Sequence, residues 1–142
     1  MCKDDLVLFT RLLVPIDLSE ASREALRLAV QIGMRLGARL TLLHVDNSPI
    51  PGGSSESKSA MHRWAALEIP ESLHYQIMVD EGVAAERINH HAIDGGHDLV
   101  VMGTHGKQGL ERVILGSVAE LVVRTCPVPV LVTHDRTDTD SS

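Results

Sequence analysis

A run of glycines near the C-terminal third of the chain has the composition of an anion-binding loop. Gly103, Gly106, Gly109 and Gly116 lie between a short aliphatic run, 99–102, and a segment with helical spacing that follows Ser117. Glycine adopts backbone conformations closed to other residues and lets a ligand approach the main chain. Successive N–H groups in such turns, together with a helix N-terminus, bind phosphate. The sequence therefore predicts a phosphate-binding loop over 103–117.

Side chains in the same loop could assist but do not identify the ligand. Lys107 and Arg112 would add positive charge at the rim, and His105 could contact phosphate or remain solvated. Ser117 with Glu120 also forms a capping box, a role compatible with phosphate binding by the backbone. The loop lacks the Gly-Lys-Ser/Thr of a Walker A motif and the spacing of a dinucleotide fingerprint.

A second polar pair follows the first aliphatic run. Asp17 and Ser19 come directly after 12–16 and precede a long helical pattern. Either residue could cap that helix, and Asp17 could also contact a ligand. Ligands of parallel sheets bind beyond the carboxyl ends of the strands, near the point where the strand order reverses. Both loops are thus expected at the same edge of the sheet.

No other residues predict catalysis or a metal site. The sequence shows no nucleophile with an assignable base and no pair of carboxylates with a defined separation. His90 and His91 are adjacent on a predicted helix and point in different directions, so a metal site is not expected. His44 is expected to be a hydrogen-bonded sheet residue. Cys126 is expected to pack rather than react.

The elements alternate between strand and helix along the whole chain. Strands are predicted at 12–16, 39–45, 73–79, 99–102 and 128–132, and helices at 19–36, 60–67, 82–93 and 118–125, with a loop at 46–59. This alternation favours an α/β fold, an open parallel five-stranded sheet with helices on both faces. We expect a single domain over 1–142, with a core of about 11–134 and flexible ends at 1–10 and 135–142.

Composition and charge limit the classes of partner. The chain has 142 residues, 44% of them hydrophobic but only 2% aromatic, so Leu, Val, Ile and Ala must build the core. The net charge of −6 argues against binding nucleic acid non-specifically. Cys2 and Cys126 form no paired motif, and we read neither a signal peptide nor a membrane span. A reduced, cytoplasmic location with no membrane partner is expected.

The motif spacing resembles that of a known family. Gly103-x2-Gly106-x9-Gly116-Ser117 is similar to the loop of the ATP-binding branch of the universal stress proteins. The segments 12–45, 81–103 and 103–132 resemble further parts of that family, and 46–73 resembles it least. The resemblance implies the adenine nucleotide alpha-hydrolase-like fold with strand order 3-2-1-4-5. It also implies a homodimer that pairs through Val128–Thr133.

The same resemblance implies roles for individual residues. ATP would be bound, with Mg²⁺ recruited by its phosphates. Gly103, Gly106, Gly116 and Ser117 would cradle the triphosphate. Asp17, after Pro15, would approach the adenosine, and the main chain at Val45 would border adenine. The implied site is completed by Thr104, His105, Gly109 and Val118. Lys107 stands where relatives often carry Arg, which keeps the charge but loses the planar fork.

Three functions follow from these observations, in order of preference. The first is an ATP-binding regulatory protein of the stress response, with no assigned catalytic residue. The second is a weak ATPase or a nucleotidyl or phosphoryl transferase. The third is a dimeric interaction module that binds no nucleotide, although that branch of the family usually lacks the glycine spacing.

Overall fold

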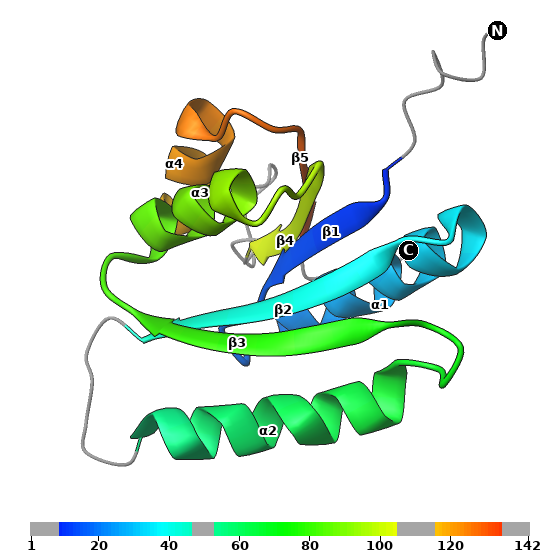
Figure 1. The fold of residues 1–142 in the computed structure, drawn as a ribbon. Coiled ribbons are helices and arrows are strands. Elements are labelled where there is room, and N and C mark those ends of the chain that lie inside the picture. The colour runs from blue at the N-terminus through cyan, green and yellow to red at the C-terminus, as the bar shows by residue number, and fades with distance from the viewer. Residues whose placement is uncertain (1–8, 47–52, 105–115, 135–142) are drawn as a thin grey trace, which may run out of the picture.

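Alternating strands and helices build the fold. The structure, a computed structural model, describes residues 9–46, 53–104 and 116–134. The elements in chain order are β1 (Arg11–Pro15), α1 (Glu20–Leu36), β2 (Arg39–Asp46), α2 (Gly53–Glu68), β3 (Tyr75–Glu81), α3 (Ala84–Asp94), β4 (Leu99–Thr104), α4 (Ser117–Thr125) and β5 (Val130–His134) (Figure 1). Residues 1–8 and 135–142, within the predicted flexible ends, lie outside the described part.

The five strands form one parallel sheet in the order β3-β2-β1-β4-β5, which confirms the predicted order. The order reverses between β1 and β4, where Leu12 and Leu13 are in register with Leu99 and Val100. The central strands are aliphatic because helices cover both of their faces.

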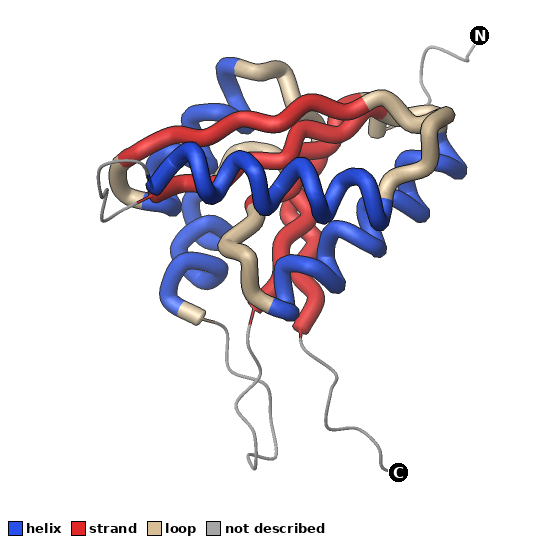
Figure 2. The backbone as a smooth tube through the Cα atoms, turned by 90° about the horizontal axis from the view of Figure 1, so that it is seen from below, coloured by secondary structure: helices blue, strands red, loops and turns tan. Residues whose placement is uncertain are grey.

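Helices pack on the two faces of the sheet and divide the core into two layers. On one face α1 and α2 cover Leu12, Val14 and Leu42, and Figure 2 shows these two helices in front of the strands. On the other face α3 and α4 cover Leu13 and Val100 (Figure 1). Neighbouring residues of one strand, such as Leu12 and Leu13, enter opposite layers because successive side chains in a strand alternate.

Helix α1 begins and ends at the residues that its sequence predicts. The hydroxyl of Ser19 accepts a hydrogen bond from the N–H of Ser22 at 3.2 Å, so Ser19 is the N-cap. Gly37 ends the helix with φ of +70°, the left-handed conformation that glycine favours. The helix is tied to α2 because Glu68 accepts hydrogen bonds from Arg23 and Arg27, each at 3.1 Å.

The prediction of a loop over 46–59 is wrong where the structure describes that segment. Helix α2 begins at Gly53, well before the predicted start at residue 60. Its Met61 and Ala65 are buried against the sheet, followed by Ile69. This packing holds the second half of the helix, and the exposed serines extend it at its N-terminus, against their weak helical preference.

Other boundaries shift by a few residues. Strand β3 runs from Tyr75 to Glu81, later than predicted, and α3 begins only at Ala84 because Gly82 has φ of +131°, outside helical geometry. Strand β4 continues to Thr104. Strand β5 begins at Val130 rather than at residue 128. In the described part of the chain no helix is long and apolar enough to cross a bilayer.

Candidate functional site

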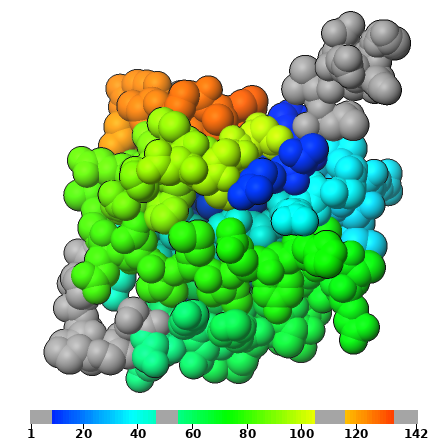
Figure 3. All heavy atoms as spheres, in the orientation of Figure 1, coloured from blue at the N-terminus to red at the C-terminus, as the bar shows by residue number. Residues whose placement is uncertain are grey.

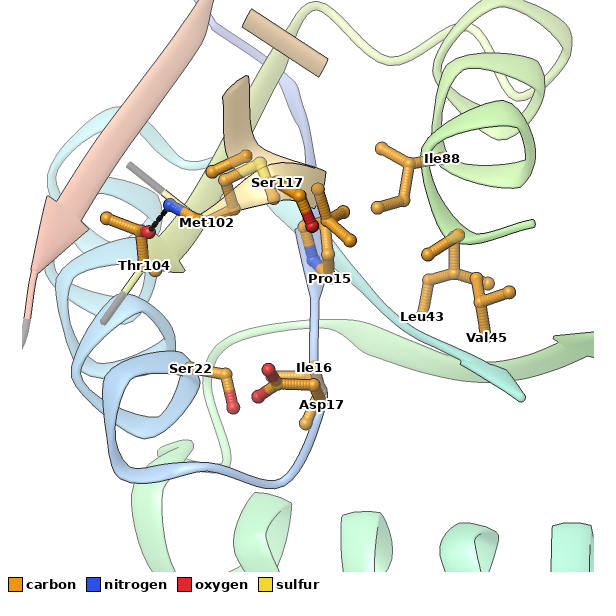
Figure 4. A pocket seen from close by; sticks show the side chains of 15 residues that line it. Pro15, Ile16, Asp17, Ser22, Leu43, Val45, Ile88, Met102, Thr104 and Ser117 are labelled. Atoms are coloured by element: carbon orange, nitrogen blue, oxygen red, sulfur yellow. Dashed lines mark hydrogen bonds between the residues drawn. The ribbon is translucent and has the colours of Figure 1, made fainter. Parts of the chain in front are cut away.

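A cavity of about 310 Å³ lies at the carboxyl ends of the strands, at the point where the strand order reverses (Figure 4). The ends of β1, β2 and β4 form its floor, and the first turns of α3 and α4 form part of its walls. This is the place at which an open parallel sheet binds ligands. The cavity is also large enough for a small molecule.

One side of the cavity is apolar. Leu43 and Val45 from β2, Ile88 from α3 and Met102 from β4 line it, and Figure 4 shows Ile88 on the same side as Leu43 and Val45. Leu43, Ile88 and Met102 are buried in the core layer between the sheet and helices α3 and α4, so their positions are fixed by packing. This side can accept a flat, weakly polar group such as a heteroaromatic ring.

Asp17 and Ser22 provide polar groups from the β1 end. Asp17 Oδ1 accepts hydrogen bonds from the N–H of Ser19, at 3.0 Å, and from the Ser19 hydroxyl. The Ser22 hydroxyl donates to the carbonyl oxygen of Ser19 at 2.9 Å. Leu18 between them has φ of +66°, an uncommon conformation for leucine. The hydrogen bonds to Ser19 therefore hold the Asp17 carboxylate at the edge of the cavity.

Thr104 and the start of α4 form the other polar wall. The N–H of Gly116 donates to Thr104 Oγ1 at 2.6 Å, drawn as the dashed line in Figure 4, and joins the two ends of the 105–115 segment. Thr104 is buried, so its hydroxyl is held in place. Thr104 therefore fixes where helix α4 begins relative to β4.

The N-terminus of α4 differs from the predicted capping box. Gly116, with φ of −67° and ψ of 163°, is the N-cap, and Ser117 is the first helical residue. No side chain within the described residues caps this helix. The capping role assigned to Ser117 is therefore wrong. The first turn faces the cavity through Gly116, Ser117, Val118 and Ala119, and its backbone dipole favours an anion there.

Gly103 is small for a reason that the sequence did not reveal. A Cβ built there would lie 2.6 Å from the carbonyl carbon of Ala21 and 3.1 Å from the nitrogen of Ser22, both backbone atoms of α1. The missing side chain lets α1 pack directly on β4. At Gly116, a Cβ would lie 3.2 Å from Thr104 Oγ1 and would crowd the hydrogen bond described above.

The shifted ionisable groups of the described residues lie outside the cavity. The hydrogen bond from His91, then that from Arg87, holds the pKa of Asp80 well below its usual range. A hydrogen bond from Arg27 lowers the pKa of Glu68, and burial lowers the pKa of His97. These groups connect helices to each other or to the sheet rather than form a reactive centre.

Comparison with known proteins adds to this geometry. A model of the universal stress protein family matches residues 8–134. The chain belongs to the universal stress protein family. Universal stress protein MJ0531 of Methanocaldococcus jannaschii is 36% identical over 141 residues, which cover 88% of this chain and 82% of the relative.

Solved structures of this family share the fold. The universal stress protein UspA from Lactobacillus plantarum superposes with a TM-score of 0.75 at 27% identity, over 90% of this chain and 99% of its own. A universal stress protein in complex with cAMP has a TM-score of 0.69 at 23% identity, over 90% and 98% of the two chains. One from Archaeoglobus fulgidus in complex with dAMP has a TM-score of 0.70 at 17% identity, over 89% and 98%. The predicted adenine nucleotide alpha-hydrolase-like fold is confirmed.

The structure brings together the predicted site residues that it describes. Those that line the cavity are Pro15, Asp17, Val45, Gly103, Thr104, Gly116, Ser117 and Val118. His105, Gly106 and Gly109, with Lys107 and Arg112, lie outside the described residues. Sequence reasoning missed Ile16, Ser22, Leu43, Ala84, Ile88, Met102 and Ala119. Leu43 could have been found two residues before Val45 on the same strand face, and Met102 as the residue before Gly103.

Histidines and acidic residues do not gather into a metal site in the described part of the chain. His90 and His91 have separate partners, since His90 lies 3.0 Å from Asp94 and His91 lies 2.8 Å from Asp80. His44 is hydrogen-bonded, with its Nδ1 2.7 Å from the carbonyl oxygen of Ile16.

Proposed function

We propose that this universal stress protein binds an adenine nucleotide, ATP, in the cavity at the ends of β1 and β4, and acts as an ATP-dependent regulator in the cytoplasmic stress response. The observation that carries the proposal is the division of this single cavity. It has an apolar side at Leu43, Val45 and Ile88, and an anion-attracting helix start at Gly116 and Ser117.

The two sides match the two ends of the ligand. Adenine would pack on the apolar side, because a planar ring gains most from contact with fixed aliphatic side chains. The triphosphate would extend toward the first turn of α4 and the glycine-rich segment, where backbone N–H groups favour negative charge. Asp17 would lie toward the ribose, whose hydroxyls are good donors to a carboxylate.

The family gives additional support. Two universal stress proteins of the same fold were solved with cAMP and with dAMP, so this fold accommodates an adenine nucleotide. Their identities to this chain, 23% and 17%, carry the fold alone. The proposal for this chain therefore rests on its own cavity. Mg²⁺ would be held chiefly by the phosphates, since the described residues offer no cluster of metal-binding side chains.

Regulation by ATP would operate in a homodimer. Strand β5 is at one edge of the sheet. Apolar side chains are exposed on it and on the preceding helix α4: Leu131 is 38% exposed, Leu121 39% and Val123 46%. An exposed strand edge is able to pair with a second copy of itself. We propose that Val128–Thr133 forms this contact and that nucleotide bound beside α4 changes its strength.

The first experiment identifies the ligand. Protein purified gently is denatured, and the released small molecules are analysed by mass spectrometry, followed by calorimetric titration of empty protein with ATP and Mg²⁺. Near-stoichiometric adenine nucleotide, or saturable binding of ATP, supports the proposal. Protein that is empty as purified and binds no ATP would contradict it and would favour the nucleotide-free interaction module.

A matched pair of variants places the binding in the cavity. Val45→Arg puts a long charged side chain on the apolar side, whereas Val83→Arg makes the same change at a residue that is 55% exposed and does not line the cavity. We expect only Val45→Arg to abolish binding, provided circular dichroism shows that both variants fold. Equal affinity in the two variants would place the nucleotide elsewhere.

A further inference from the structure

A second cavity lies at the opposite end of the sheet, where β1, β2 and β3 begin. It measures about 390 Å³, and the residues that line it and are used below are Arg11, Arg39, Thr41, His74 and Gln76. Arg11 begins β1 and Pro15 ends it, so about 13 Å of strand separates this groove from the proposed nucleotide cavity, at about 3.3 Å per residue. The two are separate sites.

The groove exists because α3 is too short to cover this end of the sheet. On the face of α3 and α4, Leu13 and Leu43 are covered by Ile88 and its neighbours. Arg11 and Thr41 precede these residues by two positions, so they are on the same face but nearer the strand starts. Figure 1 shows α3 nearer the other ends of β2 and β3, and Figure 3 shows blue atoms of β1 at the surface beside cyan atoms.

Positive charge is concentrated here in a chain of net charge −6. Arg11 and Arg39 are register partners on neighbouring strands, and like charges at such positions repel each other. Among the described residues, no carboxylate forms an ion pair with either guanidinium. The nearby Asp98 accepts hydrogen bonds from the backbone N–H groups of Thr10 and Arg11, and it does not line the groove.

The floor of the groove offers hydrogen-bond donors of fixed position. Thr41 is 4% exposed, and its Oγ1 accepts a hydrogen bond from Gln76 Nε2 at 3.1 Å. The hydroxyl proton of Thr41 is therefore still available for donation. His74, two residues before Gln76, adds an imidazole to the wall. Two guanidinium groups beside these donors match the charge and the oxygens of a phosphate.

We propose that this groove binds a small dianion of the phosphate class, either a phosphate monoester or inorganic phosphate. Arg11 and Arg39 would neutralise its charge, and Thr41 would donate a hydrogen bond to one oxygen. The anion would also relieve the repulsion between the two arginines. A local arrangement that lowers stability without a partner in the structure is typical of a binding site.

The proposal is tested by titrating the ¹⁵N-labelled full chain with inorganic phosphate and following backbone amide shifts. We expect saturable shifts at Thr41, His74 and Gln76. The double variant Arg11→Gln/Arg39→Gln should bind phosphate at least about tenfold more weakly, as expected when charge-assisted hydrogen bonds are lost. Arg35→Gln removes one positive charge at an exposed residue outside the groove and should leave the affinity within about twofold.

Two outcomes would overturn the proposal: no saturable shifts at these amides, or an equal loss of affinity in Arg35→Gln and in the double variant. A sugar monophosphate titrated in parallel separates the two sources, since tighter binding than phosphate identifies a monoester as the ligand and equal binding identifies the free anion. Val45→Arg should bind phosphate normally, which distinguishes this groove from the nucleotide cavity.

A melting experiment tests the repulsion between Arg11 and Arg39 independently, with the single variant Arg39→Gln. At low salt and without phosphate, Arg39→Gln should melt at a higher temperature than wild type, because it removes the repulsion from Arg11. Phosphate should then raise the melting temperature of wild type more than that of the variant. The proposed site would be contradicted if Arg39→Gln melted at a lower temperature than wild type and phosphate raised both melting temperatures equally.

Discussion

Replacing Gly103 by alanine should destabilise the fold, because the new methyl group would meet the backbone of α1. The added Cβ would lie 2.6 Å from the carbonyl carbon of Ala21, whereas ordinary contacts begin at 3.4 Å. The carbonyl oxygen of Ala21 would be nearer still, so the first turn of α1 must move by more than about 0.8 Å, the difference between these two distances. Rotation of a side chain cannot relieve this contact, since the atoms it meets are main-chain atoms.

The size of the effect follows from two opposing terms. Forcing one extra methyl group into a packed interior costs about 3 kcal/mol at the upper end of the usual range. Replacing glycine in a strand recovers about 0.7 kcal/mol, because alanine loses less conformational freedom on folding. The free energy of unfolding should therefore fall by about 2 kcal/mol. The melting temperature should fall by roughly 6 °C in a chain of this size.

Guanidinium chloride unfolding followed by circular dichroism measures this change, and Gly33→Ala is the matched control. Gly33 is inside α1, and a Cβ there would meet the ends of the Leu73 and Leu40 side chains, at 3.1 and 3.5 Å, rather than backbone atoms. The gain in helix propensity, about 1 kcal/mol, should offset these contacts. If Gly103→Ala is as stable as Gly33→Ala, then α1 does not depend on close packing against β4, and the reasoning is refuted.

Three further predictions concern single hydrogen bonds and ionisable groups. Thr104→Val removes the acceptor for the N–H of Gly116 and should lower the free energy of unfolding by about 1–3 kcal/mol, together with nucleotide affinity. Asp80→Asn should cost about 1.5 kcal/mol near neutral pH. It should also weaken the acid-induced loss of stability below about pH 4, because the lowered pKa of Asp80 gives stability that is present above the unfolded pKa and lost on protonation. His97→Phe should reduce the loss of stability below about pH 6.5, because burial lowers the pKa of His97 and the unfolded chain takes up the proton first.

Each of these three substitutions has a control in the chain. Thr104→Ser keeps the hydroxyl and should retain most of the nucleotide affinity. Asp94→Asn changes a carboxylate that is 64% exposed, and His74→Phe changes an exposed histidine, so these variants control for the chemical change itself at the surface. Thermal melts across the pH range provide the readout. Parallel curves for Asp80→Asn and wild type in acid would contradict the role given to that carboxylate.

The sequence predicts the fold well because the dominant signal is local and repeated. Aliphatic runs such as 99–102 identify buried parallel strands, and the cap residues Ser19 and Gly37 mark both ends of α1. The start of α2 could not be predicted in this way. Its first residues, from Gly53, have weak helical preference, and the packing of Met61 and Ala65 against a distant part of the chain stabilises the helix.

The candidate site was predictable at its polar edge and much less so on its apolar side. Glycine spacing and the position of Asp17 pointed to the strand ends, but Ile88 enters the cavity only because α3 packs over β2. The capping box at Ser117 was misleading for a related reason. A local motif was overridden by Thr104, whose hydroxyl accepts a hydrogen bond from the N–H of Gly116 and fixes the start of α4.

Stability and binding should be coupled through the end of β4, because two consecutive residues there position two helix starts. Gly103 sets how closely the first turn of α1 approaches, and Thr104 sets where α4 begins. Both first turns contribute to the proposed nucleotide cavity. A ligand that contacts both would stabilise the same arrangement that Gly103→Ala disturbs, so bound nucleotide should recover part of the lost stability by mass action. If the groove at the strand starts is independent, phosphate bound there should leave the ATP affinity unchanged.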